Sequence, residues 1–204
     1  MKFSYTSFFA SSLCFSQLVD CSPFIDFKSR DFNIRKFVKQ PTIKRLEYSE
    51  FQISDGLAGN CSKNAERVFL TPYNLTQVTV LNTESPNPIG PIDGIPIEKN
   101  DLSVCKKMTR AAIDAKESFT TAIDQSGGPK TELGKEFQNG KICNKVLKLT
   151  GKFFRSVLCL QMEVQLRVAT PAQRKKLAEQ ITKLEEAILG DQAASGQKQR
   201  SVES

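Results

Sequence analysis

The residues best suited to chemistry in this sequence are its cysteines, because the chain has six cysteines and no histidine. Without histidine it cannot build a Ser-His-Asp or Cys-His catalytic site, and it lacks the commonest metal ligand and general base. No CxxC pair is present, which disfavours a zinc site. In a secreted chain, cysteines of this number are expected to form disulfides.

Four cysteines lie in the part of the chain that is expected to fold: Cys61, Cys105, Cys143 and Cys159. Cys143 and Cys159 are 16 positions apart in one predicted helix, which is about 24 Å, whereas the Cα atoms of a disulfide lie about 6 Å apart. Each should therefore bridge to Cys61 or Cys105, and we favour Cys61–Cys143 with Cys105–Cys159. A helix break at Gly151 would reopen the pairing, and free buried thiols are the alternative.

Four lysines follow one another in the same predicted helix: Lys141, Lys145, Lys148 and Lys152. Spacings of three and four place them on one side of a helix, where they could bind a membrane surface, a polyanionic wall polymer or an acidic partner. The alternative is a solvated flank beside the buried face. Because like charges four positions apart repel, we expect a compensating group nearby.

Two glycosylation sequons are present, Asn60-Cys61-Ser62 and Asn74-Leu75-Thr76, and both matter only in a secreted chain. Asn74 is the better candidate because it lies in a proline-rich connection. Modification of Asn60 competes with early disulfide formation at its neighbour Cys61.

Carboxylates could support hydrolysis without histidine, but no local pattern brings two of them together. Asp55-Gly56 and Asp93-Gly94 lack the alternating oxygen ligands of a calcium loop and are expected to be turns. The sequence has no Gly-rich phosphate loop and no GxSxG, which are the local signatures of phosphate binding and of a serine hydrolase. It therefore predicts a protein that is not an enzyme and that uses no cofactor and no metal.

The elements that position these residues are helices, because apolar residues recur every three or four positions in long segments. The third segment carries the widest apolar stripe and should be the central helix. Five prolines between residues 71 and 100 predict a long Pro/Gly-rich loop. We expect an all-α fold, an antiparallel bundle of three long helices plus a short N-terminal helix. The expected helices are 56–69, 101–126, 131–169 and 171–190, in a domain of residues 46–190, and the polar tail 191–204 is expected to be disordered.

The N-terminal residues have the features of a secretory targeting segment. Lys2 and the apolar stretch 3–19 are typical of a secretory signal peptide over residues 1–21, with the cut between 16 and 22. A basic pro-segment, 22–45, then ends at the dibasic pair Lys44-Arg45, which favours processing before Leu46, unless the stretch stays attached. No later segment reaches the length of a membrane span, so no transmembrane anchor is expected in the mature chain.

Net charge argues against nucleic acid as a partner. The chain carries +7, but residues 1–45 hold 8 Lys/Arg and 3 Asp/Glu, which leaves 21 and 19 in residues 46–204. The body is therefore nearly neutral, whereas a nucleic-acid binder has a broad basic footprint.

Two stretches resemble known sequences: residues 51–60, FQISDGLAGN, and residues 138–149, QNGKI followed by NKVLKL. Both are similar to stretches in an uncharacterised family of small secreted proteins of filamentous fungi. The resemblance implies a signal and a short pro-segment before the first stretch. It implies a location and an architecture, but no mechanism.

Together these observations predict a secreted, non-catalytic protein that binds an extracellular or cell-wall partner, or acts as an effector. One alternative is a carrier that holds a small apolar ligand between the helices near Phe119, Phe153 and Phe154. A hydrolase that uses two carboxylates is the other alternative, and it would need two close acidic side chains in a cleft.

Overall fold

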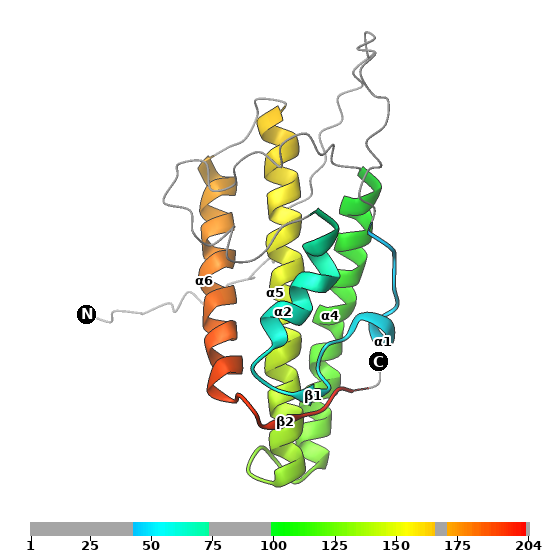
Figure 1. Ribbon diagram of the computed structural model, residues 1–204, viewed down its shortest axis with the longest axis vertical. Coiled ribbons are helices and arrows are strands. Elements are labelled where there is room, and N and C mark those ends of the chain that lie inside the picture. The colour runs from blue at the N-terminus through cyan, green and yellow to red at the C-terminus, as the bar shows by residue number, and fades with distance from the viewer. Residues whose placement is uncertain (1–42, 74–98, 166–170, 203–204) are drawn as a thin grey trace, which may run out of the picture. The chain divides into compact units, whose positions relative to one another are not determined.

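The computed structural model describes residues 43–73, 99–165 and 171–202. The long helices are α4 (Lys99–Gln125), α5 (Glu132–Gln165) and α6 (Pro171–Ala193). They run antiparallel to their neighbours, and α5 lies between α4 and α6 (Figure 1). The predicted all-α bundle of three long helices is confirmed. The expected signal peptide, most of the pro-segment and most of the proline-rich loop lie outside the described residues.

Helix α5 occupies the centre because a wide apolar stripe runs along it, as the sequence predicts, and it packs against α4, α6 and α2. Its buried apolar side chains are Cys143, Val146, Leu147, Leu149, Phe153, Phe154 and Val157. Full burial of an aliphatic or aromatic side chain contributes about 1.5–3 kcal/mol, so this helix holds the others in place.

The chain turns sharply between α4 and α5, where the sequence predicts a break. Thr131 begins α5 as an N-cap residue, because its hydroxyl accepts a hydrogen bond of 3.0 Å from the backbone N–H of Gly134. Pro171 is the first residue of α6, a position that tolerates its missing N–H.

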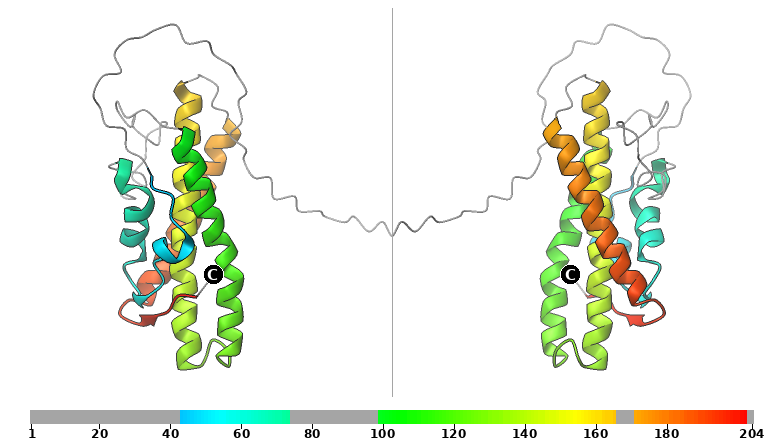
Figure 2. Two further views of the ribbon diagram at one scale, coloured as in Figure 1. Left: turned by 90° about the vertical axis from the view of Figure 1, so that its right-hand side faces the viewer. Right: turned by 90° about the vertical axis from the view of Figure 1, so that its left-hand side faces the viewer.

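Two short helices precede the bundle, α1 (Tyr48–Phe51) and α2 (Cys61–Phe69), and the turn η1 (Thr71–Tyr73) follows them. Helix α2 crosses α5 on one face of the layer formed by α4, α5 and α6 (Figures 1 and 2). The first helix was expected from Gly56. It begins later, at Cys61, because Gly56 and Leu57 form strand β1 instead.

The C-terminal residues depart most from expectation, because the tail predicted to be disordered is folded as far as the described residues reach. Helix α6 continues through Gly190 to Ala193, and Lys198–Gln199 form strand β2. Strand β2 pairs antiparallel with β1 (Gly56–Leu57), and Gly56 lies opposite Gln199. The described fold thus extends beyond Gly190, and it also includes the buried side chain of Ile43.

Candidate functional site

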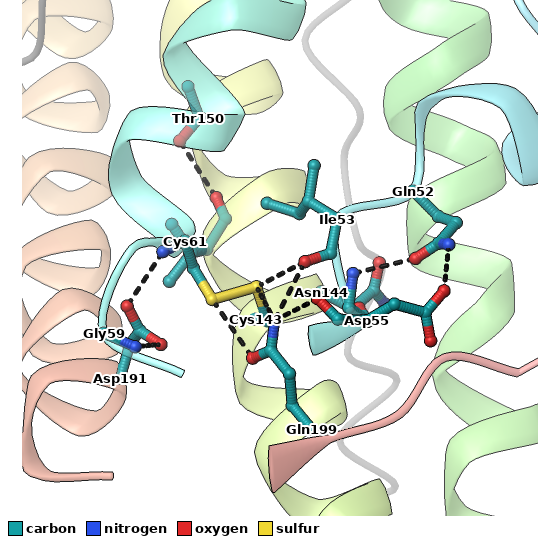
Figure 3. The surroundings of a disulfide bond; sticks show 12 residues. Gln52, Ile53, Asp55, Gly59, Cys61, Cys143, Asn144, Thr150, Asp191 and Gln199 are labelled. Atoms are coloured by element: carbon teal, nitrogen blue, oxygen red, sulfur yellow. Dashed lines mark hydrogen bonds between the residues drawn. A yellow bond between two sulfur atoms is a disulfide. The ribbon is translucent and has the colours of Figure 1, made fainter. Parts of the chain in front are cut away.

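A disulfide joins Cys61 at the start of α2 to Cys143 in α5, with an S–S distance of 2.01 Å (Figure 3). This confirms the first of the two predicted pairings. Both cysteines are buried. The carbonyl oxygen of Ile53 lies 3.0 Å from Cys143 Sγ, and Gln199 Oε1 lies 3.5 Å from Cys61 Sγ. The side chain of Gln199, in β2, therefore covers the disulfide that joins α2 to α5.

The amide of Gln199 satisfies the backbone around this disulfide. Its Nε2 donates to the carbonyl oxygens of Ile53 and Asp55, each at 3.1 Å. Asp191 acts in the same region: its carboxylate accepts from the backbone N–H of Gly59 at 2.8 Å and of Cys61 at 3.0 Å. A buried carboxylate at the N-terminus of α2 satisfies donors that the helix itself leaves unpaired, and it complements the helix dipole.

Asp55 holds the last described residues. Its carboxylate accepts from the backbone N–H and the hydroxyl of Ser201, both at 2.8 Å, and from Gln52 Nε2 at 2.6 Å. Burial acts to raise the pKa of Asp55, but these hydrogen bonds and the nearby Arg200 guanidinium together hold that pKa below its usual value. The charged carboxylate is therefore the form that the fold favours.

The stretch of residues 138–149 contacts the same C-terminal residues. Asn139 Nδ2 donates to the carbonyl oxygen of Lys198 at 2.9 Å. A Cβ on Gly140 would lie 2.0 Å from the carbonyl oxygen of Arg200, so glycine is required for the strand to approach α5. The two stretches, far apart in sequence, meet at β2 (Lys198–Gln199) and the adjacent Arg200.

Cys105 is a free, buried thiol, so its predicted bridge to Cys159 is wrong. Its Sγ donates to the carbonyl oxygen of Gly151 at 3.4 Å, which places it at the level of Gly151 on α5. Cys159 lies eight positions further along the helix, about 12 Å away, and its side chain lies outside the described part. Burial raises the pKa of Cys105 to about 12, so the thiol stays protonated at neutral pH.

The four lysines of α5 lie on the face of that helix turned away from α2. At about 100° per residue, they stand roughly 140–200° around the helix from Cys143, which faces α2. Lys145 is exposed, whereas Lys141, Lys148 and Lys152 are half-buried between α4 and α6. We call these four residues the lysine ladder. The structure places all four on one face, as the sequence predicts.

In the described part of the chain, the charges that act on Lys148 and Lys152 are further cations, some from neighbouring helices, and not the compensating acid we expected. Burial lowers the pKa of Lys148, and so do the charges of Lys152 and of Lys116 from α4. Burial also lowers the pKa of Lys152, followed by the charge of Lys183 from α6. A lowered lysine pKa means that the charged form is held in a repulsive, partly dehydrated place. Sequence reasoning missed Lys116 and Lys183, because only the packing of the helices brings them to α5.

The carboxylates are weaker candidates for a functional site than the lysine ladder. Glu47 and Asp114 both line a shallow depression of about 390 Å³ between α1 and α4. Their side chains are 78% and 56% exposed, and Asp114 is paired with Arg110 at 3.0 Å. This pair lacks the burial that raises the pKa of a general acid. In the described part of the chain, no cluster of three or more Cys, Asp or Glu side chains could hold a metal ion.

The aromatic residues considered for ligand binding are packed inside the protein. Phe119, Phe153 and Phe154 are at most 1% exposed, and the ring of Phe154 lies 5.1 Å from that of Tyr73, centroid to centroid. These aromatic side chains fill the core of the bundle.

The predicted modification sites lie near the N-terminal side of the described chain. Asn60 is exposed just before α2, beside the bridged Cys61, whereas Asn74 lies outside the described residues. Lys44 and Arg45 are exposed, and they lie between the buried Ile43 and the half-buried Leu46.

Fold and site together define a helical domain with a buried disulfide, a C-terminal strand that lies over it and a basic face on its central helix. The chain belongs to the family described as a domain of unknown function, DUF8454, which matches residues 43–203. No curated protein and no solved structure matches the chain. Among the described residues, no helix has both the length and the apolar character needed to cross a membrane.

Proposed function

We propose that this protein is a secreted, non-catalytic binding protein that recognises an anionic partner outside the cell or in the cell wall. Secretion is supported by the disulfide between Cys61 and Cys143, because structural disulfides persist in oxidising compartments. It is also supported by the resemblance to small secreted fungal proteins and by the apolar stretch at residues 3–19.

The observation that carries the binding function is the lysine ladder with its added cations. Cations act on Lys148 from its own helix and from α4, and on Lys152 from its own helix and from α6. Grouping like charges in partly dehydrated positions costs free energy in the unbound protein. A bound anion would relieve that cost, since it supplies opposite charge and brings the pKa of Lys148 and of Lys152 back toward the usual value.

Retention on a polyanionic resin tests this proposal. Replacing the ladder by glutamine (Lys141→Gln, Lys145→Gln, Lys148→Gln and Lys152→Gln) removes four charges. A control with Lys63→Gln, Lys107→Gln, Lys130→Gln and Lys135→Gln removes the same number from exposed positions, none of which is among the charges acting on Lys148 or Lys152.

The ladder variant should elute at much lower salt than the control, because the resin contacts the clustered charges. Equal elution of the two variants would mean that retention reflects net charge alone, and the proposed site would be lost. Thermal unfolding of both variants checks that they are folded. The ladder variant should be no less stable, since like-charge repulsion has been removed.

A further inference from the structure

The lysines of the ladder and the lysines beside it on α4 and α6 differ in how exposed they are. Lys141, Lys148 and Lys152 are half-buried and form a floor on α5, whereas Lys116 on α4 and Lys183 on α6 are exposed at its sides. A flat lipid surface would meet the exposed side lysines first and leave the floor unpaired. A thin chain lying lengthwise on α5 could reach floor and sides together.

The length and spacing of the four-lysine ladder suit a repeating anion. From Lys141 to Lys152 the helix rises about 16 Å, in steps of roughly 4.5–6 Å between successive lysines. Each lysine is a compact point charge with three donors. One carboxylate per step along an extended polymer would therefore be matched by one ammonium group per step of the helix.

An acidic polypeptide fits this face less well. Strand addition needs unpaired backbone N–H and C=O groups, and the backbone of α5 is hydrogen-bonded within the helix at the ladder, which lies away from both ends. Helix docking needs apolar anchors in a groove, but the ladder positions are lysines. What remains is recognition by regularly spaced negative charge alone.

We infer that the lysine ladder binds a linear acidic polysaccharide, with the sugar chain lying along α5 between α4 and α6. This inference rests on the proposed function and adds the class of ligand and its direction. About four uronate units would cover the roughly 16 Å of the ladder. Shorter oligomers would leave floor lysines unpaired, and longer ones would add few contacts to a single protein molecule.

The test is titration calorimetry of the full-length protein with galacturonate as monomer, tetramer and octamer, and with anionic phospholipid vesicles. Affinity should rise at least about tenfold from monomer to tetramer and change little per site from tetramer to octamer. The slope of log affinity against log salt should fall by up to about 3 in the four-lysine glutamine variant, since up to four counterions are no longer released.

Three outcomes would overturn the inference. Equal affinity for monomer and tetramer would indicate a single-anion site. Binding to vesicles but not to oligomers would indicate a membrane surface. An unchanged salt slope in the ladder variant would place the polymer elsewhere. If the ladder variant still loses retention on the polyanionic resin in these cases, the proposed function stands and only the polysaccharide is rejected.

A second variant separates floor from sides. Lys116→Gln with Lys183→Gln leaves all four ladder lysines in place and removes only exposed charges. For a polymer held in the floor, this pair should weaken tetramer binding less than Lys148→Gln with Lys152→Gln does. The reverse order would show that the ligand sits on the exposed side lysines and would overturn the lengthwise placement.

Discussion

Replacing Gly140 by alanine should destabilise the protein, although alanine is the better helix former. A Cβ at this position would lie 2.0 Å from the carbonyl oxygen of Arg200 and 3.0 Å from Phe119 Cε1. Backbone cannot yield as a flexible side chain can, so the C-terminal strand must move away from α5. The change therefore tests whether that strand is docked as closely as the structure shows.

The magnitude follows from the contacts that the strand would lose. These are the hydrogen bond from Arg200 N to the Glu136 carbonyl at 3.1 Å, the one from Asn139 to Lys198 at 2.9 Å, and the Arg200–Glu136 ion pair at 3.0 Å. At about 1 kcal/mol for each hydrogen bond and at most about 1 for the part-exposed ion pair, the loss is about 2–3 kcal/mol. Alanine returns up to about 1 kcal/mol through helix propensity, which leaves a net loss of about 1–2 kcal/mol.

The matched control is Gly190→Ala in α6. Its Cβ would lie 3.6 Å from Ile142 Cγ2, an ordinary contact, so the same substitution should stabilise the protein by up to about 1 kcal/mol. Urea unfolding measures both changes, and hydrogen exchange at the amide of Arg200 reports strand docking directly. If Gly140→Ala were as stable as Gly190→Ala with Arg200 still protected, the close approach would be refuted.

Three further predictions concern the disulfide, the hydrogen bonds between Asp55 and Ser201, and the N-terminal boundary of the fold. Replacing Cys61 and Cys143 together by serine should lower the free energy of unfolding by about 2–4 kcal/mol in urea titrations, because the bridge closes a loop of 82 residues; adding a reductant should then have no further effect. Asp55→Asn should destabilise at pH 7 but not in strong acid: the pKa of Asp55 is lowered by folding, so its contribution is present above the unfolded value near 4 and fades as pH falls below it. Thermal melts in which the gap between variant and wild type stays constant from pH 7 to pH 3 would contradict this. Finally, a chain cut after Arg45 loses the buried Ile43, so its free energy of unfolding should be lower by about 1.5–3 kcal/mol. Ile43→Ala in the uncut chain should largely reproduce this loss. Equal melting temperatures of the cut and uncut chains would show that Ile43 does not contribute to stability.

The long helices could be predicted because their signal is local. Apolar residues at every third or fourth position mark α4, α5 and α6, and such a stripe needs no knowledge of the partner that covers it. Helix geometry excludes a bridge from Cys143 to Cys159, which leaves Cys61 or Cys105 as its partner; the structure has Cys61. These inferences depend on distances along one element.

The C-terminal strand could not be predicted, because its stability comes from groups far away in the sequence. Residues 194–202 are mostly polar and resemble a solvated tail. Their order depends on Asp55, Asn139 and Gly140, which no local pattern connects to them. Asn139 and Gly140 lie inside a continuous helix, and nothing local marks them as the place where the C-terminal residues contact α5.

The candidate site divides in the same way. The four ladder lysines share one helix, so their common face follows from spacing alone. Lys116 and Lys183 reach the same face only through the register in which α4 and α6 pack on α5, and a single sequence does not specify that register. The prediction of a second disulfide was wrong because it also depended on the register between helices: Cys105 meets α5 at Gly151 rather than at Cys159.

The pairing of β1 with β2 has a consequence for how the chain is made. A ribosome delivers residues 56–57 long before residues 198–199, and contacts between such distant segments form late. Until residues 191–199 have been made, Gly59 and Cys61 lack the carboxylate of Asp191, and Ile53 lacks the amide of Gln199. Cys61 and Cys143 are both made before that point, so oxidation can precede the arrival of the strand that covers them. The domain can therefore close only after residues 198–199 have been made, and a nascent chain that stalls near Gly190 would leave the disulfide region uncovered.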